Sequence, residues 1–229
     1  MNARLLRDRD NFNSGDKRKT VMKVLLFNGS CRANGCTYTA LSEIAKTLDL
    51  EGIDAEILQI GNAPVRDCIG CGACVGKGKC VFGDDIANEW IEKAKTADGF
   101  VFGSPVYFAH ADGRILSVLD RVFYAGGSAF EQKPAAVVVS ARRAGTTASL
   151  DDLAKYLSIR QMPVVSSTYW NMVHGKTPED VAKDEEGLQT MRNLARNMAW
   201  ILKCIQAGKQ VGIEPPKAEK SHMTNFIRG

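Results

Sequence analysis

Short apolar runs alternate with amphipathic segments along most of this chain, and this alternation constrains its fold more than any other feature. Residues 22–30 read MKVLLFNGS, a largely apolar run that ends in Gly-Ser, as buried parallel strands often do. Residues 35–48 then carry Leu41, Ile44 and Leu48 at helical spacing. We expect strands at residues 22–30, 53–60, 99–105, 134–141 and 162–170, and helices at 35–48, 85–97, 111–125, 146–159 and 177–208, with Asp84 and Thr177 as N-caps.

Five strands that alternate with five helices predict an α/β domain: an open, doubly wound parallel sheet with helices on both faces. We expect this single domain at residues 22–208, between a flexible charged arm at 1–21 and an irregular tail at 209–229. Translation could start at Met1 or at Met22, where the first strand begins. Ligands of such sheets bind at the carboxyl ends of the strands, so the loops after the first, third, fourth and fifth strands form the candidate site.

Composition narrows the functional classes. The 229 residues include 30 Lys and Arg and 26 Asp and Glu, which gives a net charge of +4. No basic stripe is interleaved with aromatic residues, so nucleic acid is not an expected partner. No segment approaches the roughly 18 to 20 apolar residues of a membrane span, and the N-terminal residues lack the apolar core of a signal peptide. We therefore expect a cytoplasmic protein without membrane contact, in which clustered thiols serve metal or redox chemistry more often than disulfides.

The loop after the first strand, NGSCRANGCT at residues 28–37, has the composition of a phosphate site. It leads into a helix N-terminus, where free N–H groups and the helix dipole attract an anion. Hydroxyl, amide and guanidinium groups lie within it, and it contains neither the lysine of a Walker A loop nor the G-x-G-x-x-G fingerprint. A monophosphate site remains, and the alternative is a helix cap and turn without a ligand.

Three motifs together resemble one family. The pattern G-S-x-R-x-x-G-x-T after the first strand, GSPVYF after the third and the cysteines between them look like the NAD(P)H-dependent FMN reductase and iron–sulfur flavoprotein branch of the flavodoxin-like superfamily, over about residues 22–208. The resemblance implies a flavodoxin-like five-stranded sheet of order 2-1-3-4-5 and bound FMN. It places the FMN phosphate at Ser30, Arg32, Asn34, Gly35, Cys36 and Thr37.

The resemblance also assigns the flavin ring to two further loops. The third-strand loop would border the ring with Ser104, Pro105, Val106, Tyr107 and Phe108, and the fourth-strand loop with Ser140, Arg142, Gly145 and Thr146. An aromatic wall and backbone donors are what a flavin needs, although Tyr107 and Phe108 could instead pack in the core. Arg142 and Arg143 could bind the phosphates of a nicotinamide nucleotide, be solvated, or pair across a dimer.

Four of the seven cysteines fall in CIGCGACVGKGKC, inside a predicted loop at residues 64–83. The spacing C-x2-C-x2-C-x5-C with interleaved glycines suits a [4Fe-4S] cluster, because thiolates in a Gly-rich turn can converge and free N–H groups can bond the sulfurs. Zinc or no metal at all are the alternatives, the latter with thiols that cycle to a disulfide beside the flavin. The candidate ligands are Cys68, Cys71, Cys74 and Cys80.

These features predict an FMN-dependent oxidoreductase that passes electrons from NADH or NADPH to a quinone, another flavin, or a nitro or azo compound. The alternative is an iron–sulfur flavoprotein that carries electrons between a ferredoxin and a partner without NAD(P)H turnover, and a flavin-free binding module is a third reading. Hydride transfer to flavin needs no side-chain base, so we assign no catalytic residue and keep His174 as a secondary candidate. Relatives implied by the resemblance are homodimers or homotetramers, and we expect an oligomer here.

Overall fold

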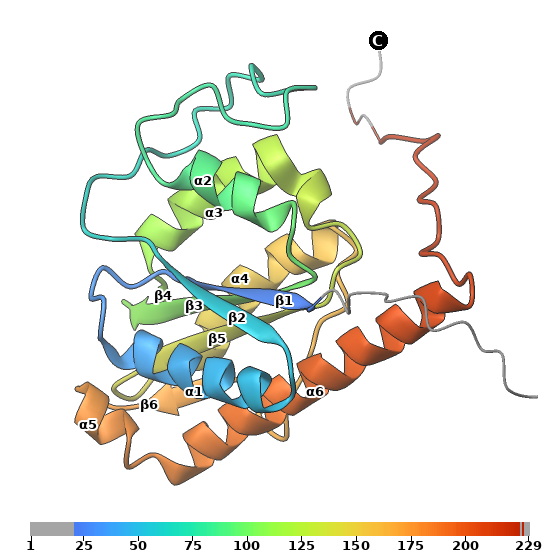
Figure 1. Cartoon of the computed structure of the whole chain (residues 1–229). Coiled ribbons are helices and arrows are strands. Elements are labelled where there is room, and N and C mark those ends of the chain that lie inside the picture. The colour runs from blue at the N-terminus through green and yellow to red at the C-terminus, as the bar shows by residue number, and fades with distance from the viewer. Residues whose placement is uncertain (1–20, 225, 227–229) are drawn as a thin grey trace, which may run out of the picture.

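The computed structural model describes residues 21–224 and 226, so the predicted N-terminal arm lies outside the described residues except for Val21. A parallel sheet lies between two layers of helices (Figure 1). The strands are β1 (Lys23–Asn28), β2 (Asp54–Gln59), β3 (Gly99–Tyr107), β4 (His110–Ala111), β5 (Ala135–Ala141) and β6 (Met172–His174). The helices are α1 (Cys36–Leu50), α2 (Ala87–Ala94), α3 (Gly113–Gly126), α4 (Thr146–Ile159), α5 (Pro178–Val181) and α6 (Glu185–Gln210), with a 3₁₀ turn at Gly127–Ala129.

The sheet has the order β2-β1-β3-β5-β6, and every neighbouring pair along this path is parallel. When the antiparallel β4 is left out of the numbering, these five parallel strands lie in the order 2-1-3-4-5. The predicted doubly wound topology is therefore confirmed. The sixth strand, β4, was not predicted. It pairs antiparallel with the end of β3 in a short hairpin.

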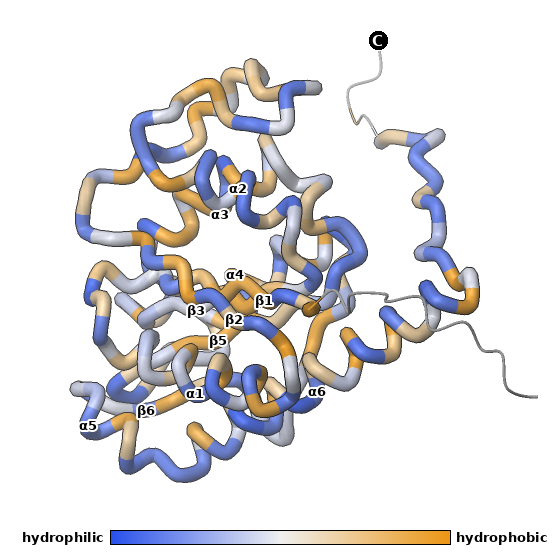
Figure 2. Tube along the Cα trace, in the orientation of Figure 1, coloured by the Kyte–Doolittle hydropathy of each residue, from blue (hydrophilic) through white to orange (hydrophobic). Residues whose placement is uncertain are grey.

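Alternate residues of the central strands enter two separate cores, which explains why their sequences are almost continuously apolar. In β1, Leu25 and Phe27 face α2, α3 and α4, whereas Val24 and Leu26 face α1 and α6. The first core is aromatic: the rings of Phe27 and Phe102 are stacked with centroids 4.9 Å apart. Figure 2 shows the hydrophobic character of these central strands. Helices on both faces leave the carboxyl edge of the sheet free for the loops.

The predicted fifth strand at residues 162–170 is wrong in most of its length. Val164 forms a single parallel bridge with Ala135, and the regular strand β6 begins only at Met172. Between them, residues 166–170 leave the sheet. The polar residues of this segment form hydrogen bonds with α6, as Ser167 Oγ does by donating to Thr190 O at 2.7 Å. The strand-like pattern of the segment could not predict these long-range contacts.

Two helix boundaries also differ from the expectation. The predicted helix at 177–208 is divided into α5 and α6, because Asp184 accepts a hydrogen bond from Gly187 N (2.9 Å) and starts a new helix. Thr177 does cap α5, in a capping box with Asp180. Asp84 is not an N-cap. Asp85 bonds the start of α2 instead: its Oδ1 accepts a hydrogen bond from Ala87 N, the first backbone amide of the helix, at 3.1 Å.

Beyond α6, the described residues from 211 to 224 form no helix or strand. Within the part of the chain that the structure describes, no helix is both long and apolar enough to cross a membrane.

Candidate functional site

The loop between β1 and α1 is held tightly against the neighbouring strand. Gly29 N donates to Gly103 O at 2.8 Å, and a Cβ at Gly29 would lie 2.7 Å from that same oxygen, so only glycine allows this approach. Ser30 N donates to Asn28 Oδ1, and Arg32 N donates to Ser30 Oγ, both at 3.1 Å. The side chain of Arg32 is exposed, as is that of Asn34. The loop therefore has a fixed backbone and an exposed cation.

A polar network that the sequence analysis missed supports this loop from below. The buried Asn28 donates through Nδ2 to Gln59 Oε1 at 2.5 Å, and Gln59 Nε2 donates to Ser30 O at 2.6 Å. Asn28 ends β1 and Gln59 ends β2, so two adjacent strands fix the carbonyl and amide of one loop residue. An amide side chain at the end of an apolar strand was the available signal.

The backbone N–H groups of the first turn of α1 have no side-chain partner among the described residues. Gly35 is the N-cap, no described side chain bonds the end of the helix, and no acidic residue lies in the first turn. The first N–H groups of any helix lack intrahelical acceptors. By contrast, side chains cap α3, α5 and α6 through Asp112, Thr177 and Asp184. The start of α1 thus combines unpaired donors, the positive end of the helix dipole and the nearby guanidinium of Arg32.

The side chains of Cys36 and Thr37 face inward from the same turn. Thr37 Oγ1 lies 2.8 Å from Ser140 Oγ, and both residues are buried. Cys36 Sγ lies 3.7 Å from Gly175 O, and burial raises the pKa of its thiol. These predicted phosphate residues therefore join the loops after β1, β5 and β6, while only their backbone amides remain for an anion.

The hairpin of β3 and β4 displays the predicted aromatic residues. Phe108 (φ 50°) and Ala109 (φ 65°) both occupy the left-handed region between the paired residues Tyr107 and His110, as in a type I′ turn. Non-glycine residues in this region are strained, and such strain often occurs at functional sites. Phe108 is 97% exposed and Tyr107 is 42% exposed, so the core-packing alternative does not hold for their side chains.

Ser104 and Pro105, by contrast, are buried at the start of the hairpin. Ser104 Oγ donates to Pro105 O at 2.8 Å and accepts from Asp112 N at 2.9 Å. Its hydroxyl thus supports the turn into α3. Val106 is half-buried beneath the exposed pair.

The loop after β5 touches this hairpin. Gly145 has φ 94°, and a Cβ at this position would lie 2.5 Å from Ala109 Cα and 2.9 Å from Val106 Cγ1. It precedes α4, which also begins without a described side-chain cap. Arg142 is exposed on this loop, as is its neighbour Arg143. Thr146 is buried.

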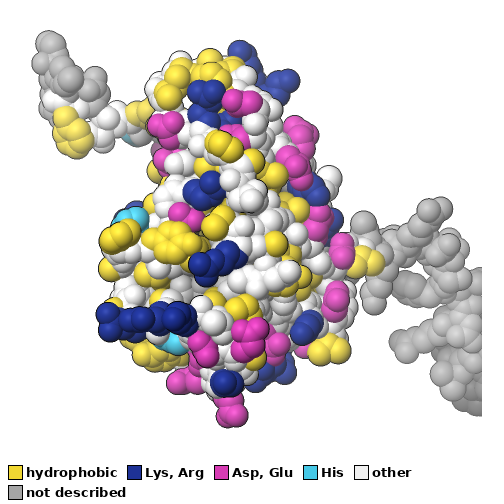
Figure 3. All heavy atoms as spheres, turned by 90° about the vertical axis from the view of Figure 1, so that its left-hand side faces the viewer, with side chains coloured by type: hydrophobic (Ala, Val, Ile, Leu, Met, Phe, Trp, Pro, Cys, Tyr) yellow, Lys and Arg dark blue, Asp and Glu magenta, His cyan; other side chains and the backbone are white. Residues whose placement is uncertain are grey.

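The structure therefore brings the three predicted loops to one edge of the sheet. Figure 3 looks onto this edge, where hydrophobic side chains and several Lys or Arg side chains meet in the middle of the face. Burial raises the pKa of Tyr107, and the charge of Cys31 in the phosphate loop raises it further. His174 ends β6 at the same edge. Its side chain is exposed, and its backbone N donates to Asp184 Oδ2 at 2.6 Å.

The four clustered cysteines lie apart from these loops, above α2 and α3 (Figure 1). They line one hollow of about 130 Å³, the cysteine pocket, together with Arg121 and Tyr124. Gly70, Gly72, Gly76 and Gly78 all have φ between 63° and 71°, a conformation that glycine adopts without strain.

All four thiols are free. As placed, no group of three or more His, Cys, Asp or Glu side chains in the described residues is arranged to hold a metal ion. A cluster or zinc ion would thus need the sulfurs to close inward around the pocket. The donor set of four thiols around one hollow fits a thiolate-bound centre in composition.

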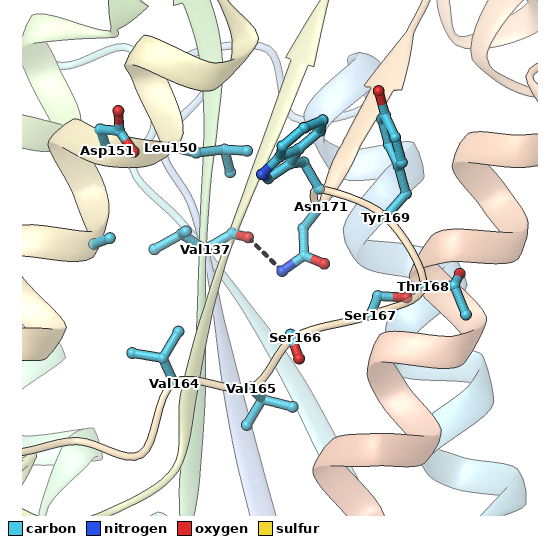
Figure 4. Close-up of a pocket in the computed structure, with 12 residues that line it drawn as sticks. Val137, Leu150, Asp151, Val164, Val165, Ser166, Ser167, Thr168, Tyr169 and Asn171 are labelled. Carbon is cyan, nitrogen blue, oxygen red and sulfur yellow. Dashed lines mark hydrogen bonds between the residues drawn. The ribbon is translucent and has the colours of Figure 1, made fainter.

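A larger cavity of about 470 Å³ lies beside the sheet edge, where residues 166–170 leave it (Figure 4). Val137 of β5 and Leu150 of α4 line it opposite the departing segment. Residues 166–170 form no backbone ladder with β5, and the side chain of Asn171 bonds β5 instead: its Nδ2 donates to Val137 O at 3.1 Å. The cavity could not be predicted from the sequence, because it depends on the interrupted strand.

Comparisons with known proteins agree with this geometry. The model of the NADPH-dependent FMN reductase family matches residues 22–177. An iron-sulfur flavoprotein of Methanocaldococcus jannaschii is 33% identical over 193 residues, which are 81% of this chain and 100% of that protein. One of Archaeoglobus fulgidus is 30% identical over 194 residues, 79% of this chain and 95% of that protein.

Solved structures share the fold at low sequence identity. A flavodoxin, WrbA-like protein from Agrobacterium tumefaciens superposes with a TM-score of 0.57 and 14% identity, over 81% of this chain and 99% of that chain. A flavodoxin from the domain Archaea gives a TM-score of 0.54 and 14% identity, over 80% and 99%. These two likenesses concern the fold alone.

Proposed function

Because the chain belongs to the NADPH-dependent FMN reductase family of the flavodoxin-like superfamily, we propose that it is an FMN-dependent oxidoreductase. It passes electrons from NADH or NADPH to a small acceptor such as a quinone, a flavin, or a nitro or azo compound. The observation that carries the proposal is the uncapped N-terminus of α1 beside the exposed Arg32. That arrangement suits a dianionic phosphate group on a monophosphate cofactor.

The residues fit FMN in distinct roles. The amides of the first turn of α1 and the guanidinium of Arg32 bind the phosphate. Tyr107 and Phe108 cover the ring from the hairpin, and the backbone around Gly145 supplies donors for its polar edge. FMN, when bound, supplies the hydride-accepting and electron-transferring chemistry. The chain binds and orients the cofactor, while Arg142 and Arg143 attract the phosphates of the nicotinamide nucleotide.

The four cysteines hold a [4Fe-4S] cluster in this proposal. Support comes from the free thiols around one pocket and from curated relatives that are named iron-sulfur flavoproteins. Such a centre would add a one-electron site to the protein. The interleaved glycines contribute N–H groups without side chains that would obstruct the sulfurs.

The same relatives favour a second candidate function. In it, the protein carries electrons between a ferredoxin and a partner through the cluster and FMN, without turnover of NAD(P)H. The mildly basic chain would suit an acidic donor, since complementary charge steers association.

Under either candidate function, we expect the protein to be a cytoplasmic homodimer or homotetramer. The exposed Trp170, which is 58% accessible in the single chain, is an aromatic residue that a second copy would cover.

One preparation tests these proposals. Anaerobically purified protein should show flavin absorption together with iron and sulfide and without zinc. NADH and NADPH oxidation is then measured with each acceptor class. Turnover supports the reductase, whereas reduction of the flavin by ferredoxin with no turnover of either nucleotide favours the carrier.

Single Cys→Ser variants assign the ligands. Serine at Cys68, Cys71, Cys74 or Cys80 should lower the iron content, and Cys204→Ser should not, because Cys204 is an exposed cysteine of α6. Protein without iron but with zinc, or with neither, would reject the cluster and leave the FMN assignment intact.

A further inference from the structure

Arg121 joins several parts of the cysteine loop to the core. It lies on α3 and is only 1% exposed. Its Nε donates to Cys80 Sγ at 3.4 Å, and its Nη2 donates to Phe82 O at 2.8 Å. Nη1 donates to Arg66 O at 3.3 Å and forms an ion pair with the buried carboxylate of Asp85. All three nitrogens of one guanidinium group are therefore directed at the loop and its exit.

Cys80 forms hydrogen bonds through its backbone as well as through its sulfur. Asn88 of α2 pairs with its backbone: Cys80 N donates to Asn88 Oδ1 at 2.8 Å, and Asn88 Nδ2 donates to Cys80 O at 3.0 Å. The backbone and the sulfur of one cysteine are thus fixed from two different helices. The other three cysteines line the same pocket from the segment whose glycines have positive φ.

The chemistry of this contact depends on the charge of the sulfur. Arginine remains protonated in proteins, and a hydrogen bond from a charged donor to a charged acceptor is stronger than a neutral one. Thiolate sulfur gains negative charge when a centre that it binds is reduced. An N–H···S bond therefore stabilises the reduced state more than the oxidised state, as hydrogen bonds to sulfur do in iron–sulfur sites.

We propose that Arg121 is a positioning residue that fixes Cys80 as the anchor of the cysteine pocket and, through its N–H···S hydrogen bond, raises the reduction potential of the centre bound there. The ion pair with Asp85 keeps the guanidinium in this orientation. The inference rests on the proposed function in one respect, since the potential requires that the four cysteines hold a redox centre. A purely structural role, in which Arg121 only ties α3 to α2, is the competing explanation.

The experiment compares Arg121→Gln and Arg121→Lys with the native chain. Arg160→Gln is the matched control, because Arg160 donates to Phe123 O, two residues further along α3, and has no hydrogen bond to the cysteine loop among the described residues. Each protein is reconstituted anaerobically with ferrous iron and sulfide. The midpoint potentials of the iron centre and of FMN are then measured in the same titration.

We expect a more negative potential for the iron centre in Arg121→Gln and an intermediate value in Arg121→Lys, which keeps the charge but loses the planar donor group. The FMN potential should stay unchanged in both, and Arg160→Gln should alter neither. An unchanged iron-centre potential in Arg121→Gln would overturn the tuning role, since a structural role does not shift a potential selectively.

Amide hydrogen exchange on the metal-free proteins tests the anchoring role separately. Peptides that cover residues 66–86 should exchange several-fold faster in both Arg121 variants than in Arg160→Gln, whereas peptides of α1 should not change. Equal protection of residues 66–86 in all proteins would reject the anchor. If the native chain takes up no iron, the proposed centre and the tuning role both fail, and the exchange result still decides whether Arg121 positions Cys80.

Discussion

Thr37 Oγ1 and Ser140 Oγ lie 2.8 Å apart in the buried junction between α1 and β5, although 103 residues separate them in the chain. This hydroxyl pair connects the phosphate loop to the loop that leads into α4. It holds the N-terminus of α1, at the candidate FMN site, against the end of the strand that precedes α4.

Removing both hydroxyls of this pair should destabilise the protein less than the sum of the two single losses. Thr37→Val or Ser140→Ala leaves a buried hydroxyl without its partner, which costs about 1 to 3 kcal/mol of unfolding free energy. The double variant should lose less than the sum, because neither unsatisfied group remains. Urea unfolding of the four proteins in a double-mutant cycle measures the difference, and strict additivity would show that the two hydroxyls do not interact.

Arg32→Gln should weaken FMN binding about tenfold by removing a charged phosphate contact. Riboflavin, which lacks the phosphate, should bind the variant and the native chain alike. Lys46→Gln is the control, because Lys46 is an exposed cation further along α1. Flavin fluorescence titrations at two salt concentrations measure both ligands. Equal losses for FMN and riboflavin would contradict a phosphate contact.

Gly145→Ala should reduce both stability and FMN binding. Its Cβ would lie 2.5 Å from Ala109 Cα, in a left-handed backbone conformation that alanine adopts only with strain. Overpacking of this kind costs about 1 to 3 kcal/mol. Gly113→Ala tests the generality of the effect, because a Cβ there meets no atom within 4 Å and alanine favours the helix. Equal changes in the melting temperature of the two variants would contradict the close approach of the loops.

Asp112 should make the stability depend on acidic pH in an unusual direction. Burial raises the pKa of this carboxyl, and its Oδ2 has no hydrogen-bond partner among the described residues. The folded state therefore binds the proton more readily than the unfolded state. Below the unfolded-state pKa, Asp112 is protonated and its burial does not lower the free energy of unfolding. As pH rises through the higher folded-state pKa, the buried charge lowers the free energy of unfolding.

Asp112→Asn should consequently be more stable than the native chain at neutral pH, because asparagine keeps the acceptor for Arg114 N without a buried charge. Asp112→Ala should lose about 1 kcal/mol because the cap is lost. Unfolding free energies across the acidic range provide the measurement. A native protein that gains stability over the range in which Asp112 ionises, relative to Asp112→Asn, would reverse the assigned direction.

Much of the fold could be predicted because its signals are local. The period of the apolar residues distinguishes strands from helices, and the helix at 146–159 has the predicted bounds. One failure occurred where a distant partner decided the outcome. Residues 162–170 have a strand-like pattern, but Ser167 binds Thr190 of α6 and the strand is interrupted. The unpredicted β4 arises because the chain reverses at Phe108 and Ala109, which carry no glycine signal for that turn.

The sequence by itself determined the order of strands and helices, and with it the edge where the loops after β1, β3 and β5 meet, because parallel strands end on one side of a sheet. It also placed four thiols within one short loop. Only the tertiary structure decided which side chains remain free for a ligand. Thr37 and Ser104 carry suitable groups in the sequence, yet their hydroxyls are occupied by Ser140, Pro105 and Asp112. The role of Arg121 likewise depends on packing, since a buried guanidinium group must find acceptors, and the cysteine loop provides them.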